Sequence, residues 1–137
     1  MPLSAARNTP MLEGTDRVIG VAANAVCYAG GLACQNAAGF AVPGSVATTL
    51  TALGRFEESV TGSATNGERL VRVRRGIFKF RNSGGGDAIT IAHRGLDCFV
   101  VDDEQVALTN GSNTRSRAGV IHDVEPDGVW VRIGLRG

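Results

Sequence analysis

The sequence predicts an all-β protein: a single-domain β-barrel or jelly-roll-like sandwich of short antiparallel strands with an extended N-terminal arm. Three observations lead to this prediction. The chain of 137 residues has the size of one domain. Its 19 glycines and its low aromatic content favour many short strands and turns over long helices. Apolar and polar residues also alternate in several short segments that end at Gly, Pro, Asn or Asp.

The clearest strand signal is the segment 117–134, which predicts a β-hairpin. Its central turn is Glu125-Pro126-Asp127-Gly128, where proline fixes one φ and glycine permits an unusual one. Trp130 alternates with the apolar residues of the second arm, so the only tryptophan is expected on an outer face, as a candidate interface anchor. The residues that share a face in each arm are Val120, His122 and Val124, then Val129, Val131 and Ile133.

The rest of the chain divides into an arm and a folded domain. Residues 1–16 show no apolar period of either kind and predict an extended N-terminal arm, which would be a disordered terminus in a monomer or would order across a neighbouring subunit in an assembly. Residues 17–137 form the predicted β-domain. Besides the hairpin, two or three short strands are expected within 18–34, one kinked strand through 71–81, and further strands at 40–42, 48–60, 88–91, 98–101 and 106–108.

A change of parity predicts a kink in the middle of the chain. Val71 and Val73 alternate with arginines, and Phe78 and Phe80 alternate with Lys and Arg, but the two pairs differ in parity. A one-residue slip exchanges the faces of a sheet. A β-bulge or glycine kink at Gly76 would therefore keep all four apolar side chains in one core.

The opposite face of this segment is strongly basic. It could bind an anionic surface, or it could be a solvated face whose charge is balanced by Glu57, Glu58 and Glu68. Because no aromatic residues interleave for base stacking, the solvated face is favoured, and a protein partner is favoured over nucleic acid. The net charge of +1 also predicts neither a nucleic-acid nor a membrane partner. The residues of this basic face are Arg72, Arg74, Arg75, Lys79 and Arg81.

Cysteine usage and hydropathy indicate a soluble protein made and folded in a cytoplasm. Cys27, Cys34 and Cys98 are an odd set without Cys-x-x-Cys spacing, so they are expected to be small buried apolar groups. The segment 18–34 is interrupted by Asn and Gly and does not resemble a targeting signal. No apolar run is long enough to span a bilayer.

No motif predicts an active site, so we expect no enzyme, no catalytic residue, no metal and no cofactor. The acidic triplet Asp102-Asp103-Glu104 lacks the spacing and the glycine of a calcium loop. The glycine run in 82–87 is not followed by Gly-Lys-Ser/Thr. His93 and His122 belong to no catalytic motif.

The two halves of the chain share a loose similarity, which suggests an internal duplication. A displacement of about 66 residues aligns several small apolar positions, and each half then ends in a Val-x-Val strand. A slightly larger displacement places Cys27-Tyr28 over Cys98-Phe99. The aligned segments are Phe40-Ala41-Val42 with Val106-Ala107-Leu108, Ala52 with Ala118, Glu57 with Asp123, and Gly62 with Gly128.

Several segments together resemble the small capsid cement or decoration proteins (minor head proteins) of Mu-like tailed bacteriophages and prophages. The resemblance covers nearly the whole chain from about Arg17. It implies an oligomeric β-barrel or jelly-roll-like domain that binds the outside of the head and strengthens contacts between major capsid subunits. The segments are Val26-Cys-Tyr-Ala-Gly-Gly-Leu-Ala33, Thr51-Ala-Leu-Gly-Arg-Phe-Glu57, Val71-Arg-Val-Arg-Arg-Gly-Ile-Phe-Lys-Phe-Arg-Asn-Ser83, Cys98-Phe-Val-Val-Asp-Asp103 and Asp127-Gly-Val-Trp-Val-Arg132.

The resemblance implies the major capsid protein and the protein itself, as a homodimer or homotrimer, as partners, and the outside of the capsid as location. The alternative is a soluble oligomeric β-barrel binding module or a small hydrolase with its site at a subunit interface. A cleft where His93 or His122 meets carboxylates would favour that alternative, whereas a flat surface crossed by the arm would favour cement. The expected capsid contacts are Arg7, Asn8, Thr9, Met11, Leu12, Arg72, Arg74, Arg75, Lys79, Arg81 and Trp130.

Overall fold

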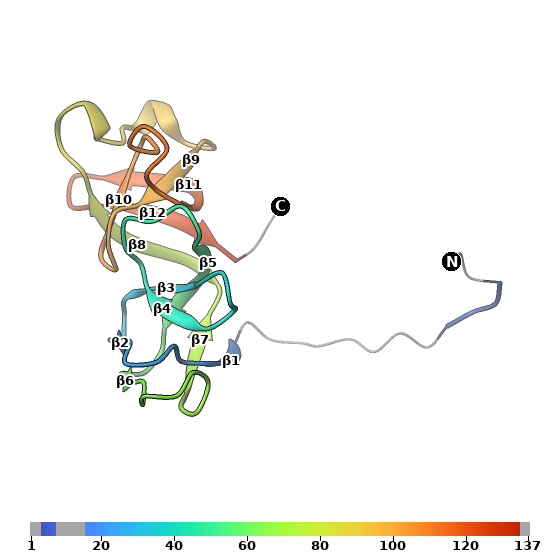
Figure 1. Ribbon diagram of the computed structural model, residues 1–137. Helices are drawn as coiled ribbons and strands as arrows, with labels where there is room; N and C mark the ends of the chain where they lie inside the picture. Colours follow the sequence, from blue (N-terminus) through green and yellow to red (C-terminus); the bar gives the residue numbers. More distant parts are fainter. Residues whose placement is uncertain (1–3, 8–15, 135–137) are drawn as a thin grey trace.

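Two lobes of short strands, joined where β7 runs into β8, make up the computed structural model (Figure 1). The structure describes residues 4–7 and 16–134. Unit 1, the blue-to-green lobe, contains β1 (Asp16–Gly20), β2 (Val26–Cys27), β3 (Leu32–Gln35), β4 (Ala41–Pro43), β5 (Thr51–Phe56), β6 (Val60–Thr61) and β7 (Leu70–Arg74). Unit 2, the olive-to-red lobe, contains β8 (Gly76–Asn82), the 3-10 turns η1 (Gly85–Asp87) and η2 (Ile91–His93), β9 (Asp97–Val100), β10 (Gln105–Ala107), β11 (Arg117–Glu125) and β12 (Gly128–Ile133).

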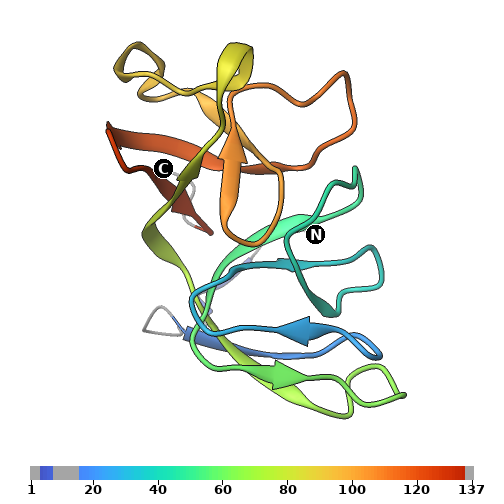
Figure 2. The ribbon, with the colours of Figure 1, turned by 90° about the vertical axis from the view of Figure 1, so that its left-hand side faces the viewer.

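The all-β prediction is confirmed, and unit 2 is a closed five-stranded barrel. Most of the predicted N-terminal arm lies outside the described residues, and residues 4–7 are exposed. Within the described ranges, no helix is long and apolar enough to cross a membrane. Figure 2 shows the two lobes one above the other, with β8 leading from the lower to the upper.

The two units have the same strand order. In unit 1 the order is β1-β7-β5-β3-β4, and in unit 2 it is β8-β12-β11-β9-β10. The small β2–β6 pair is left out of this comparison. When the five remaining strands of each unit are numbered along the chain, their order across the sheet is first, fifth, fourth, second and third in both units. The third strand also meets the first in parallel in both units, through β10 and β8 in unit 2 and through the single bridge Val21 to Ala41 in unit 1.

The pairing register repeats as well. Ala33 pairs with Gly54 and Cys34 with Ala52, which leaves Leu53 as an extra residue in a β-bulge. In unit 2 Cys98 pairs with Gly119 and Phe99 with Arg117, which leaves Ala118 as the extra residue. The displacement from 33 to 98 and from 54 to 119 is 65 residues in both strands. Strand order and register thus support the internal duplication. The displacement between the middle strands is one residue shorter than the displacement of about 66 residues expected from sequence.

One alignment within that duplication is wrong. Cys98 lies in the second strand of unit 2, and the equivalent position in unit 1 is Ala33. Cys27 belongs instead to the short extra strand β2. By contrast, the two Val-x-Val segments do correspond. Phe56 pairs with Val73 in unit 1, and Ile121 pairs with Val131 in unit 2.

Two clusters of buried side chains fill the structure, and the second joins the units. The interior of unit 1 consists of Val21, Cys27, Ala33, Ala41, Leu53, Phe56, Val71 and Val73. The interior of unit 2 includes Phe78, Phe80, Val100, Val106, Ile121, Val129, Val131 and Ile133. Leu32 and Cys34, on either side of Ala33 in β3, belong to this second cluster. Because β3 is buried on both faces, the two units share a core and form one domain.

The kink expected at Gly76 exists, but its predicted purpose is wrong. Gly76 has a positive φ of 155° and begins β8, and only Arg75 separates it from the end of β7 at Arg74. Val71 and Val73 pack in the core of unit 1, whereas Phe78 and Phe80 pack in the core of unit 2. The change of parity therefore marks the point where the chain passes from the sheet of unit 1 to the barrel of unit 2.

The hairpin of β11 and β12 is confirmed, with one face of β11 assigned incorrectly. Ile121 pairs with Val131 and Asp123 with Trp130, so His122 is the extra residue of a β-bulge. The bulge lets Ile121 and Val124 contact the same core and turns His122 to the exposed side. Trp130 alternates with buried Val129 and Val131 as expected.

Two strand boundaries also differ from expectation. The segment 48–60 is interrupted after β5 and resumes only in β6. The expected strand at 88–91 is absent from the described structure, because the side chain of Asn82 replaces a strand partner for Ile89. Asn82 Nδ2 donates to the carbonyl of Ile89 at 2.8 Å, and its Oδ1 accepts from the Ile89 N–H at 2.9 Å.

Replacing the bulge glycine of either unit with alanine should destabilise the protein by about 2 kcal/mol or more. A Cβ at Gly119 would lie 2.2 Å from the Arg132 carbonyl oxygen, and one at Gly54 would lie 2.0 Å from that of Arg74. Chemical denaturation of Gly54→Ala and Gly119→Ala measures the loss. Gly84→Ala is the control, because nothing lies within 4 Å of a Cβ there. Equal stability of all three variants would contradict this account of the bulges.

Candidate functional site

The basic face expected from sequence is divided between the two units. Arg72 and Arg74 lie on β7 in unit 1, and Lys79 and Arg81 lie on β8 in unit 2. These four side chains are exposed, whereas Arg75, at the junction, is partly buried. The structure therefore replaces one continuous stripe by two separate basic surfaces.

The arginines of unit 1 are held by carboxylates. Arg74 Nε donates to Asp16 Oδ1 at 2.7 Å and lies 3.4 Å from Glu57 Oε1. Arg72 Nε lies 3.9 Å from Asp16. Arg55 donates to Glu57 at 2.7 Å, which lowers the pKa of that carboxyl below its ordinary value. The hydrogen bond and the charge of Asp16 raise the pKa of Arg74.

The basic residues of unit 2 are paired too, and Lys79 lies beside the tryptophan. Its Nζ lies 2.7 Å from Asp127, 3.6 Å from Glu125 and 5.7 Å from the centre of the Trp130 ring. The indole N–H of Trp130 donates to Glu125. Arg81 donates to Glu104 at 2.7 Å. Such pairing matches the solvated, charge-balanced face, although of the three acids expected to balance it only Glu57 is among the ion-pair partners of the described residues.

Trp130 is only partly buried, whereas Val129 and Val131 on either side of it in β12 are buried. A hollow of about 340 Å³ adjoins it, where Arg55 of unit 1 lies 4.5 Å over the ring of Phe78. Its outward position is confirmed, and its role as an interface anchor stays a prediction. The hollow is lined by Gly30, Arg55, Ile77, Phe78, Lys79, Phe80 and Trp130.

The outward surface of the first and fifth strands recurs in both units. Val18 pairs with Arg72 in unit 1, and the corresponding pair in unit 2 is Lys79 with Trp130. Each surface thus combines a basic residue with an apolar one. Apolar side chains on these surfaces that are notably exposed are Val18 at 63%, Leu70 at 58% and Ile77 at 40%.

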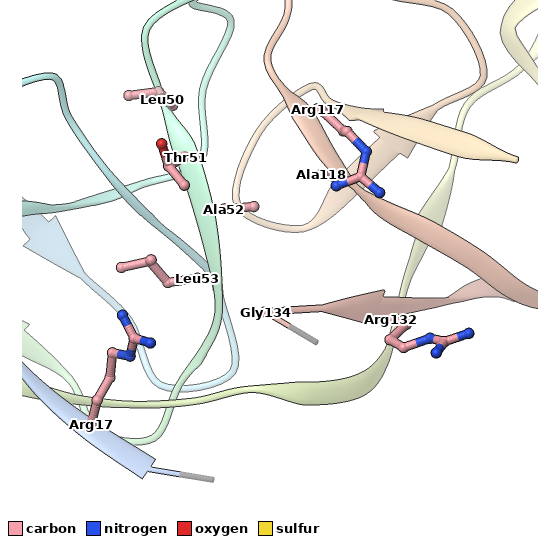
Figure 3. Close-up of a pocket in the computed structure, with 9 residues that line it drawn as sticks. All are labelled: Arg17, Leu50, Thr51, Ala52, Leu53, Arg117, Ala118, Arg132 and Gly134. Carbon is pink, nitrogen blue, oxygen red and sulfur yellow. The ribbon is translucent and has the colours of Figure 1, made fainter. Parts of the chain in front are cut away.

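A second hollow, of about 420 Å³, lies at the seam between the units (Figure 3). Its arginines come from both sides of β5: Arg17 from β1, and Arg117 and Arg132 from β11 and β12. Arg117 is paired with Asp97 at 2.8 Å. The guanidinium groups of such a surface suit the binding of a carboxylate. Sequence reasoning missed it because its residues come from four separate strands; the lining is completed by Leu50, Thr51, Ala52, Leu53, Ala118 and Gly134.

The potential nucleophiles and bases do not converge. Burial raises the pKa of the Cys27 thiol to about 11 and those of Cys34 and Cys98 to about 12. His93 Nδ1 accepts the backbone N–H of Thr90 at the end of η2, while His122 is exposed on its bulge. The cysteines are free and buried, as expected from sequence.

The acidic triplet forms a turn. Asp102 Oδ1 accepts the backbone N–H of Glu104 at 2.8 Å, and burial raises the pKa of Asp103. Across residues 4–7 and 16–134, no three His, Cys, Asp or Glu side chains are grouped as a metal ion would require.

The expected contacts in the arm fall mostly outside the described residues. Asn8, Thr9, Met11 and Leu12 belong to the part that the structure does not describe. Arg7 is described and exposed. The arm contacts therefore remain predictions.

Comparisons with protein-family models, with curated proteins and with solved structures found no match to this chain.

The native cysteines should react with a thiol reagent such as DTNB far more slowly than a free thiol at about pH 8, because a raised pKa leaves almost no thiolate there. All three should react once guanidinium unfolds the chain. Tyr28→Cys is a suitable control, because Tyr28 is 62% exposed and should add one rapidly labelled thiol. Rapid labelling of the unmodified native protein would contradict the burial of its thiols.

Glu57→Gln should lower the free energy of unfolding by about 1 kcal/mol near neutral pH and by less in acid. The folded pKa of Glu57 lies below the ordinary value of a glutamate, mainly because Arg55 donates a hydrogen bond to it. The stabilisation is therefore complete above the unfolded pKa and is lost as the pH falls through the folded one. Urea denaturation at several pH values measures it, with exposed Glu58→Gln as control. A difference from wild type that does not change with pH would refute the linkage.

Proposed function

We propose that this protein decorates the outer surface of a tailed-phage head and cements neighbouring major capsid proteins. The observation that carries the proposal is the duplication, since one domain presents the same outward strand pair twice, as β1–β7 and as β8–β12. A cement has to hold more than one subunit, and two similar surfaces at a fixed separation suit that task. The sequence resemblance described above points to the same class.

The core explains how such a part can be stiff. β3 packs on the interior of unit 1 with one face and on the interior of unit 2 with the other. The two outward surfaces are therefore coupled through buried side chains instead of a flexible linker. A stiff bridge transmits force between the subunits that it contacts.

Stabilisation of the capsid would come from binding alone. A protein bound to two capsid subunits adds its binding free energy to the cost of separating them, and repeated copies make modest contacts collectively large. This function needs no catalytic group and no cofactor. The exposed apolar residues Val18, Leu70 and Ile77, together with Trp130, supply contact area beside charged residues.

The main test is whether the chain is a stoichiometric component of purified heads from the phage or prophage that encodes it. Heads lacking the protein should regain it from solution. Trp130→Ala should reduce occupancy roughly 30-fold at subsaturating protein, because truncating an aromatic anchor typically costs about 2 kcal/mol. Ile91→Ala serves as the exposed control outside both surfaces.

Removal of residues 1–15 should also weaken head binding. This deletion spares Asp16, which is part of β1 and pairs with Arg74. Unchanged occupancy with the shortened chain would exclude the arm as a contact, and absence of the chain from purified heads would refute the proposed function.

A further inference from the structure

Strand β1 has one paired edge and one open edge. The Val21 N–H donates to the Arg69 carbonyl at 2.8 Å, on the side of β7. In an antiparallel ladder alternate residues bond to the same neighbour. Ile19 and Arg17 therefore also bond toward β7, while the backbone N–H and C=O of Val18 point to the other side.

That other side is closed only at the end of the strand. The Ala22 N–H donates to the Ala41 carbonyl at 3.0 Å, next to the bridge between Val21 and Ala41. Among the described residues, no strand other than β7 pairs with Asp16–Gly20. Outward backbone N–H and C=O groups such as those of Val18 are a template for another strand.

The duplicated strand of unit 2 shows how such an edge is protected. Val18 corresponds to Lys79, since Ile19 pairs with Val71 and Phe80 with Val129 at equivalent points of the two units. Proteins commonly place lysine on edge strands to prevent pairing between molecules. In β8 the next outward N–H, that of Arg81, also donates to the Glu104 carbonyl at 2.7 Å. β1 instead carries a valine that is 63% exposed.

We infer that β1 pairs with β1 of a second copy, antiparallel and around a two-fold axis at Val18. Each Val18 then exchanges both backbone hydrogen bonds with Val18 of the second copy, and the two side chains contact each other. An axis at Asp16 would instead place two carboxylates opposite each other, which is unfavourable. Because the pairing is self-complementary, it forms a dimer that adds no further copies. In this dimer the sheet of unit 1 continues into the sheet of unit 1 of the second copy.

The first test is a cross-link in the full chain. Val18→Cys should form a disulfide-linked dimer, at twice the 14.2 kDa of one chain, when copper phenanthroline oxidises the two facing thiols. The matched control is Lys79→Cys, at the equivalent position of β8, and it should remain largely monomeric under the same conditions. A failure of Val18→Cys to cross-link, or equal cross-linking of both variants, would overturn the inference.

The second test is the mass of the free protein in solution. Over a concentration series in sedimentation velocity, wild type should approach a dimer. Val18→Lys, which introduces the residue found in β8, should remain a folded monomer, because Val18 is exposed and two lysines would face each other in the pairing. A wild-type monomer at every concentration, a trimer, or a dimer that survives Val18→Lys would each refute pairing through β1. These tests use no capsid, so their failure is distinguishable from failure of the proposed function.

Discussion

The close approach of a glycine to a carbonyl, Gly54 to Arg74 and Gly119 to Arg132, is the contact on which both units depend. Beyond each glycine the fourth strand pairs with two neighbours at once. Arg55 pairs with Leu32 and Arg74, and Val120 pairs with Asp97 and Arg132. A side chain at the glycine would push these strands apart. Its absence, with the bulge beside it, lets the sheet curl far enough for its first and third strands to meet.

The outer face of the second strand differs between the two units, in β3 and in β9, and this difference explains how the units stack. Leu32 and Cys34 lie on the outward face of β3 and are fully buried against unit 2. Asp97 corresponds to Leu32 and is exposed, paired with Arg117. Unit 1 therefore has an apolar outer face, which is buried against unit 2. Unit 2 has a charged outer face that water can cover, as terminal repeats of stacked proteins do.

Exposed basic side chains in both units are paired with carboxylates. The basic residues on β7 and β8 meet carboxylates from β1, from the segment after β5 and from the turn of the last hairpin. Such exposed pairs contribute little to stability, but they remove any strong local field. A partner of such a surface would be recognised through shape, apolar contact and matched charges. That agrees with the proposed role as a cement better than with attraction of a polyanion.

The sequence by itself determined the fold class, the last hairpin, the outward position of Trp130, the burial of the cysteines and the kink at Gly76. These features depend on local alternation, turn chemistry and residue size, which are readable within a few residues. Only the tertiary structure decided that Gly76 separates two cores, that His122 is a bulge residue and that Asn82 replaces a strand partner for Ile89. It also revealed the exact register of the duplication and the open edge at Val18. The register, the open edge and the two cores depend on pairing and packing between strands far apart in the chain, and no local pattern specifies which strands will meet. The bulge at His122 and the hydrogen bonds of Asn82 to Ile89 are local, but the sequence does not specify which partner each group takes.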